Sequence, residues 1–166
     1  VVANLFPLTA IQHQGFLSAQ YGAQGAGARM VAVTPGRGDE AMLEGRHTEA
    51  AVRFVETHRA TVLWGIATFV RRLVMCAQDI GADLSAVRLV FAMGEACPQP
   101  FREDLKARLE GLGASGVTVQ NGYGFTEMQG PTYQCREGGA FHLPCPEFFH
   151  LEIVDSETHE PMSHGE

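Results

Sequence analysis

The segment from Asn121 to Glu127, Asn-Gly-Tyr-Gly-Phe-Thr-Glu, gathers several residue types that bind ligands. Its two glycines let the backbone approach a ligand closely, because neither carries a side chain. Tyr123 offers a ring that stacks on a base, and the hydroxyl of Thr126 suits a phosphate oxygen. The carboxylate of Glu127 is a hard oxygen ligand, of the kind that Mg²⁺ takes together with substrate phosphates. Composition alone leaves a second interpretation open, an ordinary turn after a strand with an exposed glutamate.

Three cysteines and one histidine form a second group with ligand chemistry. Cys135, His142 and Cys145 are close in sequence, and the expected fold places Cys97 in a neighbouring loop. Three thiolates and one imidazole are the soft ligands of a closed tetrahedral zinc site. Residues 130–146 have little apolar content, and a bound ion would keep such a segment ordered. We therefore predict structural zinc at these four residues, although buried free cysteines are common and the spacing matches no standard zinc finger.

Hydrophobic patterning predicts alternating strands and helices. Strands are expected at 29–34, 61–64, 87–93 and 117–120, and helices at 48–59, 66–78 and 98–112. Within the last two helices, apolar side chains recur at helical spacing, which is typical of a face that packs on a core. After a change to loops, a further strand is expected at 149–154.

This alternation predicts the α/β class, with a mostly parallel sheet, helices on both faces and right-handed crossovers. We expect residues 1–166 to form one domain or subdomain, in which 128–166 is a loop and strand extension. In such a sheet, the loops that follow the strands share one edge, and ligands bind there. The loops at Gly65, 94–97 and 121–127 all fall at that edge, so they should meet in one crevice.

Composition limits the classes of partner. The 166 residues carry a formal net charge of −7, and their 12 Lys and Arg residues are scattered. No basic stripe is present that would neutralise a phosphate backbone, so no nucleic-acid partner is expected. No segment has the length and apolar character of a membrane span, and no secretion signal is recognisable, which favours a cytoplasmic location. The chain starts without Met, and we expect it to be a piece of a longer protein.

Several motifs, in order along the chain, resemble one enzyme family. Tyr123-Gly124-x-Thr126-Glu127 is similar to the core motif of the adenylate-forming superfamily, and Gly94-Glu95-Ala96 resembles its adenine-binding turn, one strand–helix–strand unit earlier. The downstream motifs resemble the phenylacetate–CoA ligase family of AMP-forming acyl-CoA ligases. These motifs are Gly130-Pro131, Phe141-His142-Leu143, Leu151 to Asp155, and Thr158-x-Glu160-Pro161. The resemblance implies an internal piece of the large N-terminal domain of such a ligase.

The resemblance also implies roles for individual residues. Thr126 would bind the α-phosphate of ATP, and Glu127 would help to hold Mg²⁺. By position, Trp64, Gly65, Ile66 and Phe69 match the segment that lines the acid pocket, and an aromatic, apolar wall suits an aryl or arylacetyl group. A plain core role for Trp64 and Phe69 stays open. The residues that would contact the nucleotide are Gly94, Glu95, Ala96, Asn121, Gly122, Tyr123 and Gly124.

The reaction that the resemblance implies has two halves. An aromatic carboxylate attacks the α-phosphate of ATP, which gives an acyl-adenylate and pyrophosphate, and the thiol of CoA then displaces AMP. In the first half the protein mainly positions groups and neutralises charge. The family's phosphate loop and catalytic Lys have no counterpart in these residues. We expect both in the missing N- and C-terminal parts of the same enzyme, and we expect the 166 residues alone to be inactive.

Other functions remain open at this level. The acyl acceptor could be a carrier-protein thiol instead of CoA, or the chain could be a nucleotide-binding module without turnover. The run from Gly22 to Gly27 suggests a nicotinamide-dependent dehydrogenase, but it precedes the expected strand at 29–34, whereas a dinucleotide fingerprint follows a strand and opens a helix. The sequence contains no Gly-x-Ser-x-Gly elbow, so a hydrolase is disfavoured. The oligomeric state is also open, a homodimer included.

Overall fold

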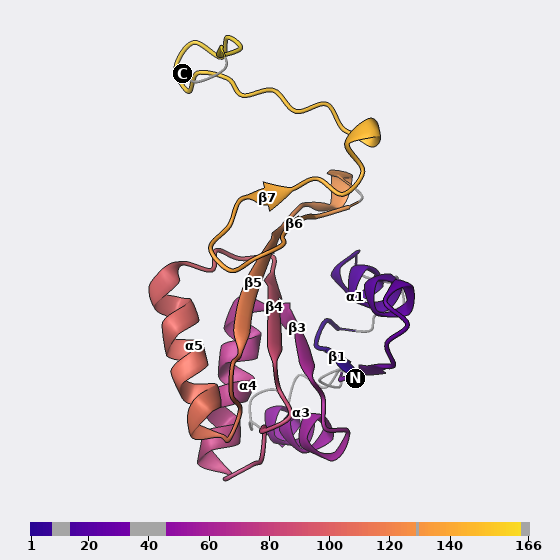
Figure 1. Ribbon diagram of the computed structural model, residues 1–166, viewed down its shortest axis with the longest axis vertical. Coiled ribbons are helices and arrows are strands. Elements are labelled where there is room, and N and C mark those ends of the chain that lie inside the picture. The colour runs from indigo at the N-terminus through magenta and orange to yellow at the C-terminus, as the bar shows by residue number, and fades with distance from the viewer. Residues whose placement is uncertain (8–13, 34–45, 129, 164–166) are drawn as a thin grey trace.

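The computed structural model describes residues 1–7, 14–33, 46–128 and 130–163. The described strands form one seven-stranded sheet in the order β2-β1-β3-β4-β5-β6-β7 (Figure 1). β1 to β5 run parallel, and β6 and β7 extend the sheet in antiparallel fashion. The predicted α/β class with a mostly parallel sheet is therefore confirmed. The strands are β1 (Val2–Asn4), β2 (Met30–Ala32), β3 (Val62–Ile66), β4 (Leu89–Met93), β5 (Thr118–Tyr123), β6 (Thr132–Gln134) and β7 (Phe141–His142).

Helices cover both faces of the sheet, as the pattern predicts. Helices α3 (Arg46–Thr57), α4 (Ala67–Asp79) and α5 (Gln99–Gly111) pack on one another and on one face. Helix α1 (Gln14–Gly25) contacts β1 and β2 and lies on the other side in Figure 1. Helix α1, before β2, and helix α3, after β2, thus lie on opposite faces of the sheet. Within the sheet, β1 lies between β2 and β3.

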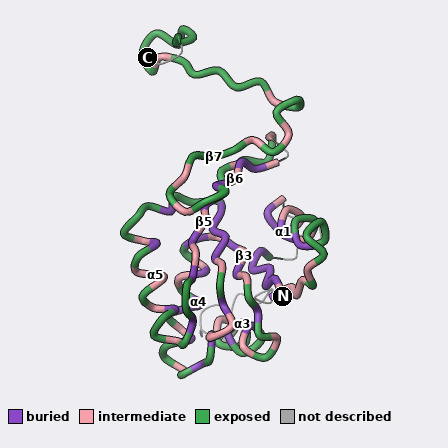
Figure 2. The backbone as a smooth tube through the Cα atoms, viewed as in Figure 1, coloured by how far each residue is buried: buried purple, intermediate pink, exposed green. Residues whose placement is uncertain are grey.

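Alternation along the central strands explains these two layers, because successive side chains of a strand point to opposite faces. Leu63 on β3 and Val90 on β4 belong to the larger core cluster, which α3, α4 and α5 cover. Phe91 and Met93, on the opposite face of β4, form a smaller cluster with Phe16 of α1. Figure 2 shows the buried residues along the strands and on the helix faces that cover them.

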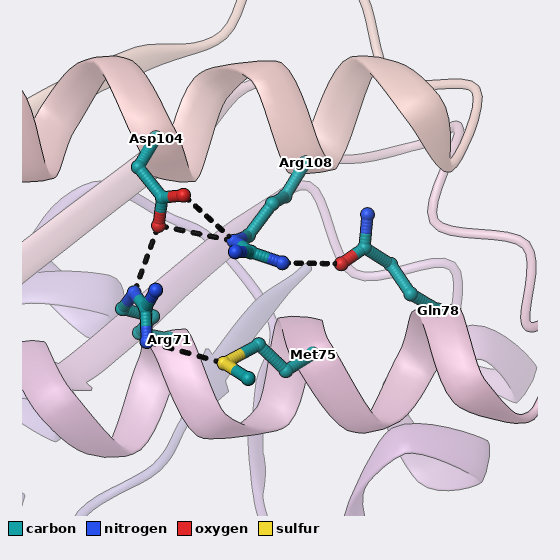
Figure 3. A network of polar contacts seen from close by, with 5 residues as sticks. All are labelled: Arg71, Met75, Gln78, Asp104 and Arg108. Carbon is teal, nitrogen blue, oxygen red and sulfur yellow. Dashed lines mark hydrogen bonds and ion pairs between the residues drawn. The ribbon is translucent and has the colours of Figure 1, made fainter.

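A polar network joins α4 and α5 outside the core (Figure 3). The carboxylate of Asp104 accepts hydrogen bonds from Arg108, at 3.0 Å to both oxygens, and from Nε of Arg71, at 2.8 Å. Arg108 also donates to the side-chain oxygen of Gln78 at 2.8 Å, and Arg71 to the sulfur of Met75 at 3.2 Å. One carboxylate thus holds two guanidinium groups, one from each helix.

The structure differs from the sequence-based predictions at one expected strand and at two elements that were not predicted, and it settles the interpretation of one glycine run. The strand expected at 149–154 does not form, and Val154 makes only an isolated bridge with Pro161. Helix α1 and strand β1 were not predicted. The run from Gly22 to Gly27 lies at the end of α1 and just beyond it, so it closes a helix instead of opening one, which removes the dehydrogenase interpretation.

The C-terminal part leaves the body of the molecule. After β7, a short 3-10 turn (Pro146–Phe148) leads into a mostly exposed arm that reaches away from the sheet in Figures 1 and 2. None of the described helices has the length and apolar character needed to cross a membrane.

Candidate functional site

The candidate site begins with the register of three parallel strands. Ile66 of β3 pairs with Met93 of β4, and Met93 pairs with Gly122 of β5. The carboxyl ends of these strands therefore lie side by side, and the loops after β4 and β5 meet at one edge of the sheet, as predicted. Gly65, which was expected in a third loop, lies within β3, and this strand runs directly into α4. Gly94 has a φ of 76°, a conformation that glycine adopts at little cost, and turns the chain directly after β4.

Two of these loops line a pocket of about 590 Å³, which we call the loop pocket. The exposed ring of Tyr123 stands at its edge, 6.3 Å between centroids from Phe141 of β7 and 6.4 Å from Phe125. All seven residues that we assigned to the nucleotide by resemblance line this pocket. The complete lining is Gly94, Glu95, Ala96, Cys97, Pro98, Arg102, Asn121, Gly122, Tyr123, Gly124 and Phe141.

Asn121 places an unsatisfied acceptor in the wall of the loop pocket. Its side chain is only 8% exposed, and its Oδ1 is the one buried side-chain polar atom without a hydrogen-bond partner among the residues that the structure describes. A buried acceptor without a partner costs about 1–3 kcal/mol, so a ligand that donates an N–H here would gain from satisfying it. The backbone N–H of Asn121 donates to Gln134 at 3.1 Å, which fixes the residue in β5.

A buried guanidinium holds the parts of the loop pocket together. Arg102, 5% exposed on α5, donates from Nε to the carbonyl of Cys97 at 2.7 Å. Its Nη1 donates to the carbonyl of Val119 and to Oε1 of Gln134, each at 2.9 Å. These acceptors belong to the loop after β4, to β5 and to β6. Arg102 therefore joins three segments that are distant in sequence, and no carboxylate of the described residues forms an ion pair with it.

Glu137 adds a negative charge to this region. Its carboxylate lies 2.7 Å from Nζ of Lys106 and accepts the backbone N–H of Val119 at 3.1 Å. Burial raises the pKa of this carboxyl, but the bonds from Lys106 and Val119 and the nearby charge of Arg102 outweigh burial and hold the pKa below its ordinary value. Glu137 is therefore ionised at neutral pH and offsets part of the charge of Arg102.

A second pocket, of about 210 Å³, lies against α1. We call it the α1 pocket. Phe6 reaches it from the end of β1, where buried Asn4 accepts the N–H of Phe6 at 3.1 Å and donates to the carbonyl of Phe16 at 3.0 Å. Its walls also include Thr126, and it shares Gly94 and Gly124 with the loop pocket. The full lining is Phe6, Gln14, Gly15, Ser18, Met93, Gly94, Gly124, Phe125, Thr126, Gly130 and Pro131.

Thr126 and Glu127 lie in a 3-10 turn (Thr126–Met128) that follows, in sequence, the residues 121–124 of the loop pocket. Both side chains are exposed at the ligand edge of the sheet. The side chain of Glu95 contacts the start of α4. Its carboxylate accepts the backbone N–H of Thr68 at 2.8 Å and the hydroxyl of Thr68 at 2.9 Å, at the start of α4.

The residues predicted to line an acid pocket lie outside the walls of both pockets. Trp64 is half-buried against Phe91, with ring centroids 4.7 Å apart, and its Nε1–H donates to the sulfur of Met93 at 3.1 Å. Gly65 is buried against Leu5, and Phe69 packs on the larger core cluster. Trp64 reaches the α1 pocket indirectly, through Met93, and Ile66 packs on the same small core cluster.

The structure does not gather the four predicted zinc ligands. Sγ of Cys135 lies 3.2 Å from Nε2 of His142, but within the described ranges no three His, Cys, Asp or Glu side chains are arranged to hold an ion. Cys97 is part of the core cluster, 4% exposed, and burial raises the pKa of its thiol, which disfavours the thiolate that a metal requires. The arrangement of side chains therefore does not support the zinc prediction.

Comparison with known proteins identifies the family. The family model described as AMP-binding enzyme matches residues 8–166, a range that contains nearly all the walls of both pockets. The chain belongs to the AMP-binding enzyme family. A search of curated proteins gives no match.

Solved structures share the fold of this AMP-binding enzyme. A long-chain-fatty-acid–CoA ligase, FadD1 from Archaeoglobus fulgidus, has a TM-score of 0.68 at 13% identity, over 99% of this chain and 32% of its own. A 2-hydroxyisobutyryl-CoA ligase, in complex with 2-HIB-AMP and CoA, has a TM-score of 0.62 at 14% identity, over 77% of this chain and 27% of its own. The nonribosomal peptide synthetase FmoA3, in its AMPPNP-bound form, has a TM-score of 0.60 at 20% identity, over 80% and 13%. The chain thus spans a third or less of these proteins.

Sequence reasoning missed several wall residues of this AMP-binding enzyme. Arg102 lies on a helix and looks like an ordinary surface arginine, and Phe141 was quoted only as part of a downstream motif. Phe6 and Met93, at the ends of β1 and β4, form the apolar wall of the α1 pocket. Their position directly after or at the end of buried strands is the signal that would have found them.

Proposed function

We propose that this chain carries the nucleotide and acid sites of an ATP-dependent ligase, of the phenylacetate–CoA ligase branch. The enzyme would activate an aromatic carboxylic acid as an acyl-adenylate and transfer the acyl group to CoA. One observation supports this proposal most directly. The loop pocket and the α1 pocket share Gly94 and Gly124, so ligands in the two pockets would meet beside Thr126. A reaction that joins a carboxylate to a nucleotide phosphate needs such a junction.

In this proposal the loop pocket takes the adenine of ATP. The exposed ring of Tyr123 is available for stacking, and Gly94 and Gly122 bring backbone into the lining of the pocket. The unsatisfied Oδ1 of Asn121 matches the exocyclic amine of adenine, a donor that guanine does not carry at the same position.

The α1 pocket would take the acid. Phe6, Met93 and Phe125 give it an apolar wall, and its volume of about 210 Å³ is small on the scale of ligand pockets. Such a space favours a one-ring acid over a long acyl chain. We therefore assign the acid to this pocket, and Trp64 and Phe69 to the supporting layers around it.

The chemical step follows from this placement. A carboxylate oxygen of the acid attacks the α-phosphorus, an O–P bond forms, and the bond to the leaving pyrophosphate breaks. The hydroxyl of Thr126 would donate to an α-phosphate oxygen. We assign Glu127 to Mg²⁺. This carboxylate and the phosphates would hold the ion together, and the ion would neutralise the charge of the phosphates. The thiol sulfur of CoA then attacks the acyl carbon, AMP leaves, and the thiol proton passes to solvent.

Binding of AMP to the chain, followed by calorimetry, tests the nucleotide assignment. Asn121→Leu removes the acceptor, and a hydrogen bond contributes about 0.5–1.5 kcal/mol net, so we expect AMP to bind up to about tenfold more weakly. The same variant should unfold at an equal or higher urea concentration, because it removes a buried acceptor without a partner. Gln120→Leu is a similar replacement of an amide side chain by leucine, one residue away and outside both linings, and it should leave AMP affinity within about twofold.

Two results would overturn the assignment. One is AMP binding that is unchanged in Asn121→Leu, and the other is a chain that binds GMP as well as AMP. The acyl acceptor needs a separate assay with the longer protein, in which CoA and a carrier protein compete. Preference for the carrier protein would move the enzyme into the adenylation-domain class.

A further inference from the structure

Helix α4 starts without a capping residue of its own. The N-cap position is Ile66, in extended conformation with φ −67° and ψ 133°, and no side chain of its own segment caps the helix. An isoleucine side chain has no acceptor, whereas the first backbone N–H groups of any helix lack partners within the helix. The sequence of β3 and α4 alone therefore leaves the start of this helix unsatisfied.

Glu95 supplies the missing acceptor from the next loop. Its Oε2 accepts the backbone N–H of Thr68, the second residue of α4, at 2.8 Å. Its Oε1 accepts the hydroxyl of the same threonine at 2.9 Å. This is the bond that an N-cap side chain would make, and a carboxylate near a helix N-terminus is further stabilised by the helix dipole. The cap comes from a residue 27 positions away in the chain.

The contact also fixes the wall of the loop pocket. Gly94, immediately before Glu95, lines both pockets and turns at a φ of 76°. A glycine at this point leaves the loop free to move unless a neighbour holds it. The nearest atom to a Cβ built on Gly94 is Cγ1 of Ile66, at 3.9 Å, so the capped end of α4 lies directly behind the loop. Asn121, with its buried and unpartnered Oδ1, lines the same pocket from the neighbouring strand β5.

We propose that Glu95 is a positioning residue for the nucleotide. By capping α4, its carboxylate holds Gly94, Glu95 and Ala96 in the shape that receives the base, and its side chain does not need to touch the ligand. This role rests on the proposed function, because it assigns the loop pocket to a nucleotide. It also means that the start of α4 is already occupied by a carboxylate of the protein, so the carboxylate of the substrate binds elsewhere.

Three variants of the chain separate positioning from simple helix stability. Glu95→Ala removes the cap, and Glu95→Gln keeps one neutral acceptor. Glu95→Ala combined with Ile66→Thr gives α4 a local N-cap hydroxyl, but the loop after β4 still lacks its bonds to Thr68. Hydrogen exchange of the Thr68 amide reports the cap, and the dissociation constant of AMP reports the pocket.

We expect Glu95→Ala to exchange the Thr68 amide at least about tenfold faster and to bind AMP about tenfold more weakly, the effect of a lost charge-assisted bond. Glu95→Gln should fall between this variant and the unchanged chain. In the double variant, protection at the start of α4 should return, while AMP binding stays weak. Recovery of full AMP affinity in the double variant would reduce Glu95 to a helix cap and overturn the proposal.

Two further results are decisive. If Glu95→Ala loses protection at Thr68 but keeps full AMP affinity, the cap does not position the pocket, and the positioning role is wrong while the proposed function stands. If the unchanged chain binds no AMP, although the Thr68 amide responds to Glu95→Ala, the proposed function is wrong and the nucleotide role of Glu95 falls with it.

Discussion

Gly122 lies where two large side chains leave little room for a Cβ atom. A Cβ built there would be 3.0 Å from Cγ of Met93 and 3.1 Å from Cε1 of Phe91, closer than ordinary van der Waals contact. Both neighbours belong to the smaller core cluster and are themselves buried. The glycine therefore allows β5 to pack on this cluster and, at the same position, exposes backbone to the loop pocket.

Replacing this glycine should lower stability. We expect Gly122→Ala to reduce the free energy of unfolding by about 1–3 kcal/mol, the usual range for overpacking a core. Gly25→Ala is the matched control, because Gly25 is in α1 with nothing within 4 Å of its built Cβ. That change should stabilise the chain by about 0.5–1 kcal/mol, since alanine is the better helix former. Urea unfolding of both variants measures the difference. Equal stability of the two would contradict the packing account.

Replacing Arg102 should lower the free energy of unfolding by at least as much as replacing Gly122. Arg102→Met removes the guanidinium donor from the carbonyls of Cys97 and Val119, and it removes one of the two donors to Oε1 of Gln134. We expect a loss of about 3 kcal/mol in the free energy of unfolding, with a smaller loss for Arg102→Lys, which keeps a donor and the charge. Thermal or urea unfolding decides this. A Met variant as stable as the unchanged chain would show that water replaces the guanidinium.

The candidate site was predictable to the extent that its residues are contiguous. Asn121 to Glu127 carries glycines, a ring, a hydroxyl and a carboxylate in one run, and the structure places most of that run in the pocket walls. Arg102 was not predictable, because its three acceptors come from separate segments that only the folded sheet brings together. The same limit applies to Glu95, which was noticed as part of a motif but whose partner Thr68 lies 27 residues earlier, at the start of α4.

At the scale of elements, glycines explain why α1 was missed. Gly15 and Gly22 lower the helical tendency of this segment. In the folded chain each serves packing, because a Cβ on Gly15 would lie 2.5 Å from the ring of Phe6, and one on Gly22 would lie 2.7 Å from the ring of Trp64. Tertiary contact outweighs local propensity here. The strand expected at 149–154 fails for the converse reason, since its pattern is right for a strand but the described residues offer it no neighbouring strand.

The pairing of α4 and α5 makes stability depend on pH through Asp104. Hydrogen bonds from Arg108 and then Arg71 hold the pKa of Asp104 below its ordinary value. A carboxyl whose pKa is lower in the folded chain adds stability above its unfolded pKa of about 3.9, and this contribution disappears as the pH falls through the lower folded value.

We therefore expect Asp104→Asn to be less stable than the unchanged chain at pH 7, and the difference to shrink below about pH 4. Urea unfolding at several pH values measures this. Glu103→Gln is the control, because Glu103 is the exposed neighbour outside the network of Figure 3. A gap between Asp104→Asn and the unchanged chain that is as wide at pH 3 as at pH 7 would contradict the assignment.

At the scale of the whole molecule, the chain spans 13% to 32% of the structures compared with it. It contains the loop pocket and the Thr126–Glu127 turn, which we assign to the nucleotide, and we expect the phosphate loop and the catalytic Lys of the family in other parts of the enzyme. We propose that binding and turnover are therefore separable in this protein.

The chain should bind AMP and yet give no exchange of labelled pyrophosphate into ATP with benzoate or phenylacetate. A longer form of the protein that includes those two elements should show the exchange. Exchange by the 166 residues themselves would prove that they contain a complete active site.

The contact between Trp64 and Met93 has an optical consequence. Trp64 is the single tryptophan of the chain, so all indole emission comes from one ring. That ring donates its N–H to the sulfur of Met93, whose side chain lines the α1 pocket. A ligand that displaces the thioether changes the surroundings of the indole, and titration with phenylacetate should shift its emission. Met93→Leu removes the sulfur, so the emission shift should disappear. Because leucine conserves the volume of methionine, phenylacetate should still bind. If the α1 pocket takes the acid as proposed, Trp64 would act as a built-in fluorescent reporter of acid binding.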